Sequence, residues 1–163
     1  EKDYRFLNNK PAPIPKDERG DMVSAYYKRL TFNDKDTRIK AAKSWSIWEA
    51  STSKLIQNEK SLHSFDDEKV AEAFARIECH YFTNNGFFET DNWLIENSYK
   101  IKDIPTDIVQ GRYDVVCPMV SAWELHKALP ESGFHVIPDS GHSMTEDGIR
   151  SKLVELTDRY AND

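Results

Sequence analysis

The spacing of apolar residues changes near residue 100. Before that point, apolar residues recur every three or four positions, which is typical of amphipathic helices. This spacing predicts three helices, over 17–30, from Asn33 or Asp34 past Trp48, and from Ser64 to about Asn84. After residue 100, short β-branched runs alternate with helical stretches. These predict strands over 106–110 and 134–137 and helices over 119–129 and 146–160. The pattern indicates an α/β protein with a mostly helical region over 1–100 and a strand–helix region over 101–163.

The third predicted helix has the clearest start and the most informative pattern. Ser64 precedes Asp67 by three residues, in the manner of a capping box. Two adjacent apolar stripes follow at helical spacing, one of Val70, Phe74, Ile77 and Tyr81 and the other of Ala71, Ala75, Glu78 and Phe82. Glu78 therefore lies on the apolar side, where a carboxylate is costly to bury without a partner.

A second glutamate has a similar position on the second predicted helix. Ile39, Ala42, Trp45 and Trp48 point inward, and Glu49 lies one position off that stripe. Periodicity alone favours the view that Glu49 and Glu78 are boundary residues whose carboxylates reach solvent or an arginine. A binding role for the two carboxylates is the alternative.

Charge and composition exclude several classes of partner. The 163 residues carry a net charge of −6 without a block of Lys or Arg, so we expect no nucleic-acid partner and no anionic membrane surface. No apolar run approaches the roughly 18 residues of a membrane span. Cys79 and Cys117 lie far apart and outside any CxxC, which indicates free thiols in a reducing compartment such as the cytoplasm. The five histidines show no metal-ligand spacing, so we expect neither a metal nor a cofactor.

An acid and a histidine follow the two predicted strands. Asp114 comes just after the first strand and its Gly111, and His142 comes just after the second. A helix between two strands implies a parallel pair, whose carboxyl ends share one edge of the sheet. Asp114 and His142 are then two-thirds of a nucleophile–base–orienter system. Taken separately, each is also compatible with an ordinary turn aspartate and a loop histidine.

Several segments resemble one known family. Residues 108–118, Ile-Val-Gln-Gly-Arg-Tyr-Asp-Val-Val-Cys-Pro, resemble the C-terminal part of proline iminopeptidases, as do 122–128 and Asp-Ser-Gly-His-Ser at 139–143. The helical segments 42–49 and 76–82 resemble the same family. The resemblance extends over nearly the whole chain from about Pro13 onward.

The resemblance implies a fold and a set of roles. Proline iminopeptidases are serine peptidases of the α/β-hydrolase fold that release an N-terminal proline, with a helical cap inserted over the catalytic sheet. By position, Asp114 matches the triad acid and His142 the triad base. Glu49 and Glu78 match the two cap carboxylates that hold the imino nitrogen of the peptide substrate, and Cys117 matches a pocket cysteine linked to sensitivity toward thiol reagents.

The sequence also departs from the family pattern. It contains no G-x-S-x-G for the nucleophile and no HG-rich oxyanion segment, and Cys79 stands where the family usually shows asparagine. We therefore expect the second half of an enzyme, inactive alone and completed by an N-terminal half in the same longer chain or in a second chain. The alternatives are a truncated, non-catalytic binding module and another capped hydrolase of the esterase kind.

Overall fold

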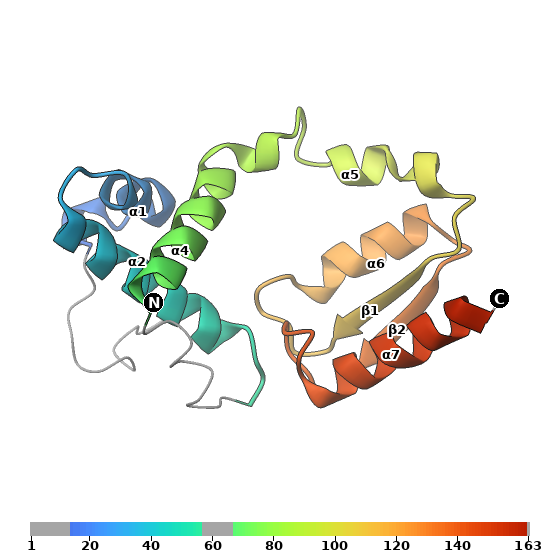
Figure 1. Ribbon diagram of the computed structural model, residues 1–163. Coiled ribbons are helices and arrows are strands. Elements are labelled where there is room, and N and C mark those ends of the chain that lie inside the picture. The colour runs from blue at the N-terminus through green and yellow to red at the C-terminus, as the bar shows by residue number, and fades with distance from the viewer. Residues whose placement is uncertain (1–13, 57–66, 163) are drawn as a thin grey trace. The chain divides into compact units, whose positions relative to one another are not determined.

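The computed structural model describes residues 14–56 and 67–162, which form two compact units. Among the described residues, the first unit comprises 14–51 and 67–88, and the second comprises 52–56 and 89–162. Figure 1 shows helices in the first unit and strands with helices in the second. The prediction of a mostly helical first region and a parallel strand pair in the second is confirmed. Among the described helices, none combines the length and the hydrophobicity that a membrane span requires.

The first unit is built on three helices, α1 (Met22–Leu30), α2 (Lys35–Thr52) and α4 (Glu68–Thr83). The predicted helix over 17–30 is wrong in its first turns. A short 3-10 helix, η2 (Lys16–Glu18), ends before Gly20, and α1 begins only after Asp21, whose carboxylate caps it by accepting from Ser24 N. Asp34 begins α2 as predicted, since its Oδ2 accepts from Thr37 N at 2.8 Å.

Of its two predicted apolar stripes, helix α4 buries only the alanines of the second, Ala71 and Ala75, while Phe82 of that stripe is 50% exposed. Its cap is Asp67, whose carboxylate accepts from the backbone N–H groups of Lys69 and Val70, while Ser64 lies outside the described residues. The fully buried positions are small ones, Ala71, Ala75 and Cys79. The larger side chains of the other stripe, Val70, Phe74, Ile77 and Tyr81, are exposed in the described structure.

Small residues on α4 explain this choice of face. Alanines allow a neighbouring helix to approach closely, and Ser46 Oγ of α2 lies 3.3 Å from the Ala71 carbonyl oxygen. The core around them contains Ile14, Ala25, Tyr26, Leu30, Ala41, Ala42 and Trp45. The Arg38–Glu72 ion pair, at 2.8 Å, adds a further link between α2 and α4.

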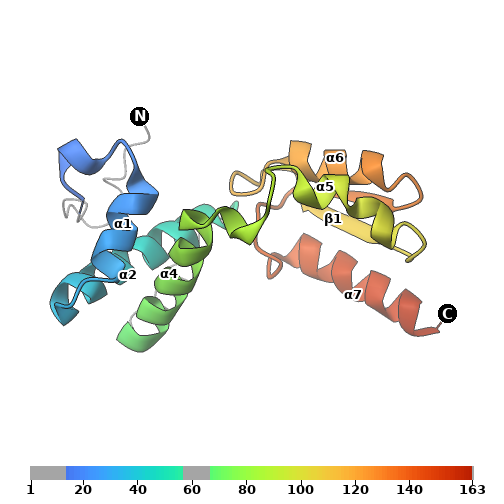
Figure 2. The same cartoon turned by 90° about the horizontal axis from the view of Figure 1, so that it is seen from above.

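The second unit contains a two-stranded parallel sheet, β1 (Asp107–Gly111) and β2 (Gly133–Ile137). Helices α6 (Met119–Ala128) and α7 (Asp147–Asn162) lie on opposite sides of the two strands in both views (Figure 2). In the register, Asp107 pairs with Gly133 and Gly111 with Ile137. The strand and helix predictions for this region are therefore confirmed to within one or two residues at each end.

Between α4 and β1, where every residue is described, lie three short helices that the sequence pattern did not predict. They are η4 (Asn85–Phe87) in the first unit and α5 (Trp93–Glu96) and η5 (Ser98–Ile101) in the second. Each has three or four residues, too few to show a helical period.

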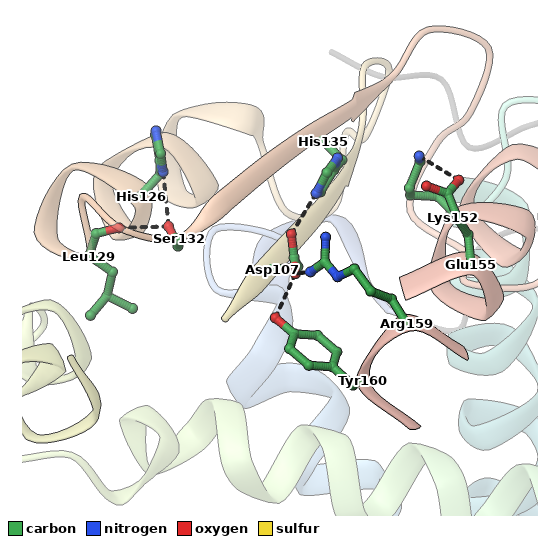
Figure 3. A network of polar contacts seen from close by, with 9 residues as sticks. All are labelled: Asp107, His126, Leu129, Ser132, His135, Lys152, Glu155, Arg159 and Tyr160. Carbon is green, nitrogen blue, oxygen red and sulfur yellow. Dashed lines mark hydrogen bonds and ion pairs between the residues drawn. The ribbon is translucent and has the colours of Figure 1, made fainter. Parts of the chain in front are cut away.

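The beginning of β1 is tied to α7 by a buried carboxylate (Figure 3). Asp107 accepts hydrogen bonds from Tyr160 Oη at 2.6 Å and from Arg159, and its Oδ1 lies 2.6 Å from His135 Nε2 on β2. This network fastens the amino-terminal end of the strand pair and leaves the carboxyl-terminal end for the loops that carry Asp114 and His142.

Candidate active site

The structure brings Asp114 and His142 together. They lie on the loops that follow β1 and β2, and His142 Nδ1 is 3.0 Å from Asp114 Oδ2. The carboxylate side chain is 6% exposed and the imidazole 39% exposed. Because a carboxylate only accepts hydrogen bonds, Nδ1 carries the proton and Nε2 is left as the basic nitrogen. This is the arrangement in which an aspartate orients a histidine for proton transfer.

Backbone groups hold the other carboxylate oxygen of Asp114. Its Oδ1 accepts from Val116 N at 2.9 Å and from Cys117 N at 2.8 Å. The Asp114 backbone N–H closes a turn on the Gly111 carbonyl at 3.3 Å. Backbone groups of its own loop thus hold the Asp114 side chain independently of His142.

Gln110, the fourth residue of β1, adds a side-chain donor to the same loop. Its Nε2 lies 3.3 Å from Asp114 Oδ2, 3.1 Å from the Cys117 carbonyl oxygen and 3.2 Å from the Gly111 carbonyl oxygen. Sequence reasoning used this glutamine only as the end of a strand. Its signal in the sequence was a polar residue directly after the apolar pair Ile108 and Val109, and the structure leaves it only 8% exposed.

The His142 loop is held against the segment 52–56 of the same unit. The backbone N–H groups of His142 and Ser143 both donate to the Ser53 carbonyl, at 3.0 and 2.7 Å. The carboxylate of Glu146 accepts from Gly141 N at 2.9 Å and from Leu55 N at 3.0 Å. These contacts determine where the imidazole lies, and the sequence pattern gave no signal for them.

Glycines allow the two loops to meet. A Cβ on Gly111 would lie 1.8 Å from the carbonyl oxygen of Gly141. Next to this contact, Tyr113 N donates to the Ser140 carbonyl at 3.0 Å. A side chain at position 111 would therefore push apart the loops that carry the acid and the base.

The two glutamates lie in the first unit. Glu78 is partly buried on α4, and its Oε2 accepts from Trp45 Nε1 at 2.6 Å. Glu49 is 9% exposed and lies one helical turn after Trp45 on α2. The predicted position of Glu49 off the inward stripe is therefore wrong, because Glu49 belongs to the buried face and Trp48 is only half-buried. Sequence reasoning missed the role of Trp45 as a donor to Glu78.

The two cysteines differ in their surroundings. Cys117 is exposed and contributes its backbone N–H to Asp114, whereas Cys79 is fully buried, and neither forms a disulfide bond. Burial raises the pKa of the Cys79 thiol, which makes it a core residue rather than a nucleophile. Within residues 14–56 and 67–162, no three His, Cys, Asp or Glu side chains form a group that could hold a metal ion.

The second unit presents an imidazole in hydrogen-bond contact with a carboxylate, and the first presents Glu78 bound to the Trp45 N–H and Glu49 one helical turn after Trp45. Comparison with known proteins gives this arrangement a context. No family model matches the sequence. A probable proline iminopeptidase of Leptolyngbya boryana is 62% identical over 148 residues, which are 91% of this chain and 46% of the relative. The proline iminopeptidases of Xanthomonas citri and Arabidopsis thaliana are 50% and 48% identical over 91% and 90% of this chain, and 47% and 39% of their own lengths.

The helices and the parallel strand pair define an α/β protein, which carries a hydrogen-bonded acid–histidine pair on the loops after its two strands. Over nine-tenths of its length, the chain is a homologue of proteins named proline iminopeptidase, and the resemblance seen in its motifs is confirmed. The chain spans about half the length of the curated relatives it matches.

Proposed function

We propose that this chain supplies the acid, the base and the amine-binding carboxylates of a proline iminopeptidase with the α/β-hydrolase fold. In this proposal, residues 1–100 are the helical cap and residues 101–163 the C-terminal part of the catalytic domain. The observation that carries it is the 3.0 Å contact between His142 Nδ1 and Asp114 Oδ2 on neighbouring strand ends. Sequence identity to proteins named proline iminopeptidase, over about half the length of those proteins, supports the same assignment.

The reaction is an acyl transfer to a serine outside these 163 residues. His142 Nε2 takes the proton of the serine hydroxyl as the oxygen attacks the prolyl carbonyl, and then returns it to the leaving amine. Asp114 keeps the imidazole in the Nδ1–H tautomer and stabilises the imidazolium that forms. Among the described residues, His142 Nε2 has no hydrogen-bond partner, which supports its role as the base.

Glu49 and Glu78 would recognise the substrate. A protonated N-terminal proline is a secondary ammonium with two N–H donors, and two carboxylates match it in number and charge. Two carboxylates in a semi-apolar site repel each other when no ligand lies between them, and this repulsion favours the binding of a cation there. In this proposal, Cys117 lines the pocket beside the acid.

Two other hypotheses are less well supported. A truncated, non-catalytic binding module and an esterase-like hydrolase are not favoured by relatives that are named as proline iminopeptidases. The two free thiols are in line with a reducing, cytoplasmic location for the enzyme.

The test is Glu78→Gln in the complete protein that contains this sequence. Loss of the charge should lower kcat/KM for a proline amide by roughly 10- to 100-fold, since a hydrogen bond to a charged group is worth about 1.5–3 kcal/mol. Hydrolysis of a simple ester that lacks an amine should change little, because the triad is untouched.

The matched control is Glu68→Gln on the same helix. Glu68 is half-exposed, and the ion pairs it makes with described residues are long surface pairs with Lys35 and Lys43, at 3.9 and 3.5 Å. Its replacement should leave both activities unchanged. An unaltered preference for proline in Glu78→Gln would contradict the proposal.

A further inference from the structure

Gln110 is a buried amide next to the acid, and sequence reasoning gave it no role. It lies at the carboxyl end of β1 and is 8% exposed. Its Nε2 reaches the same oxygen of Asp114, Oδ2, that faces His142 Nδ1. A buried polar group in contact with a reacting pair either satisfies its own hydrogen bonds or positions that pair.

The orientation of the amide is fixed by its neighbours. The three groups around Nε2 are a carboxylate and the carbonyls of Gly111 and Cys117, all of which only accept hydrogen bonds. The amide oxygen in that place would face three acceptors, so the nitrogen must lie there. The two N–H bonds of Gln110 are therefore shared among three acceptors of one loop.

The two oxygens of Asp114 are held in different ways. Oδ1 is fixed by the backbone N–H groups of Val116 and Cys117. Oδ2 has two side-chain donors, Gln110 Nε2 and His142 Nδ1. Without Gln110, the side-chain donor to Oδ2 that remains among the described residues is a partly exposed imidazole, so Oδ2 is held less firmly than Oδ1.

We propose that Gln110 is a positioning residue that aims Asp114 Oδ2 at His142 and so keeps the imidazole in its Nδ1–H tautomer. It acts through Asp114 and does not touch the substrate. Its link to the Cys117 carbonyl also closes the 111–117 loop on the strand end. The consequence for turnover rests on the proposed peptidase function, whereas the consequence for the tautomer does not.

The test compares Gln110→Met and Gln110→Glu with the unmodified complete protein. Methionine keeps the length of the side chain and removes the donor, and glutamate places a further acceptor among the three already present. In each variant, ¹⁵N NMR of the imidazole nitrogens should show a larger share of the Nε2–H tautomer of His142. For proline-amide hydrolysis, kcat should fall by roughly 10- to 100-fold while KM stays within about twofold.

Ser132→Ala is the matched control for loss of a buried polar group in the same unit. Ser132 Oγ donates to the Leu129 carbonyl at 2.7 Å and lies 2.9 Å from His126 Nδ1, away from the 111–117 loop (Figure 3). Its replacement should lower the thermal midpoint without moving the tautomer of His142 or kcat. If Gln110 had a purely structural role, Gln110→Met would also lower the thermal midpoint and leave the tautomer of His142 and kcat unchanged.

Three outcomes decide the matter. An unchanged His142 tautomer in folded Gln110→Met overturns the proposal, whatever the activity. If neither Gln110 variant folds, the test is solvent exchange of the Gln110 side-chain amide in the unmodified protein. Exchange as fast as that of the exposed Asn33 side chain overturns the proposal. Markedly slower exchange supports it. If the His142 tautomer shifts in Gln110→Met while the unmodified protein releases no proline, the peptidase function is contradicted and the positioning role is supported.

Discussion

Trp45 Nε1 lies 2.6 Å from Glu78 Oε2, so the indole of α2 donates a hydrogen bond to a carboxylate of α4. The indole is buried and packs edge-on against Tyr26, with ring centroids 5.2 Å apart. A rigid donor of this kind leaves Glu78 with one fixed oxygen. If Glu78 binds the substrate amine as proposed, Trp45 sets the direction in which its carboxylate meets that cation.

The first prediction is that Trp45→Phe weakens substrate binding. Phenylalanine fills much of the same space but lacks the N–H, so the Glu78 carboxylate loses a charge-assisted hydrogen bond. KM for a proline amide should rise about tenfold, on the basis of about 1.5 kcal/mol for such a bond, with a smaller change in kcat. Steady-state kinetics of the complete protein measure both.

Trp48→Phe provides the comparison within the same helix. Trp48 is half-buried, and its ring centroid lies 6.4 Å from that of Trp45. Its replacement perturbs the same aromatic cluster and leaves the Trp45–Glu78 bond in place. Equal effects of the two substitutions on KM would show that packing, and not the hydrogen bond, determines binding.

The second prediction concerns Glu146, which joins the His142 loop to the segment 52–56. Glutamine at this position keeps one acceptor but turns its NH₂ group toward a backbone N–H. Whichever of the Gly141 and Leu55 amide protons faces the NH₂ group should then exchange with solvent roughly tenfold faster in Glu146→Gln, because one hydrogen bond of about 1.5 kcal/mol is lost. Hydrogen exchange followed by NMR resolves the two positions.

The neighbouring Asp147 supplies the control. Its side chain is 89% exposed and pairs with Arg150 on the surface. Asp147→Asn should leave both exchange rates unchanged. Slow exchange at Gly141 and Leu55 in Glu146→Gln would mean that Ser53 alone holds the loop.

The third prediction tests the close approach of the two loops. In Gly111→Ala, the new Cβ would overlap the carbonyl oxygen of Gly141, which is backbone and cannot rotate away. We expect a loss of about 3 kcal/mol in the free energy of unfolding, as for overpacking of a close contact. Urea denaturation gives the value. Gly20→Ala, where nothing lies within 4 Å of the added Cβ, should cost little.

The fold and the acid–histidine pair could be predicted because their signals are local. Strands and helices of five or more residues show their period, and parallel pairing then places Asp114 and His142 at one edge. The Asp34 cap of α2 was visible for the same reason. The first turns of the predicted helix over 17–30 were wrong, because a side-chain cap at Asp21 competes with helix continuation.

The burial of Glu49, the buried face of α4 and the contacts of Gln110 and Glu146 depend on tertiary packing, which the spacing of residues in a single sequence does not predict. Periodicity placed Glu49 off the buried stripe, yet Trp45 and Glu49 share a face at i and i+4. On α4, large apolar side chains suggested a buried stripe, but close helix packing selected the alanines. The contacts of Gln110 and Glu146 link residues to backbone groups of other loops, and no spacing rule predicts them.

The fourth prediction is a pH dependence that originates at Asp107. Hydrogen bonds from Tyr160 and His135, together with Arg159, hold the pKa of Asp107 below its usual value, while the Asp107 carboxylate raises the pKa of Tyr160. A carboxyl whose pKa is lowered by folding stabilises the protein above the unfolded pKa, about 3.9. That contribution is lost as the pH falls through the lower, folded value.

Asp107→Asn should therefore change the shape of the acid limb of the stability curve. The unmodified protein should be more stable than the variant at pH 5–6, and the difference should shrink steadily below about pH 4, where Asp107 becomes protonated. Urea denaturation at a series of pH values from 6 to 2.5 measures this difference. Asp158 is an exposed residue on the same helix as Tyr160. In Asp158→Asn, the free energy of unfolding should follow the same pH dependence as that of the unmodified protein over the whole range. A constant offset between Asp107→Asn and the unmodified protein over the whole range would place the acid sensitivity elsewhere, because only a titrating carboxylate makes the two curves converge.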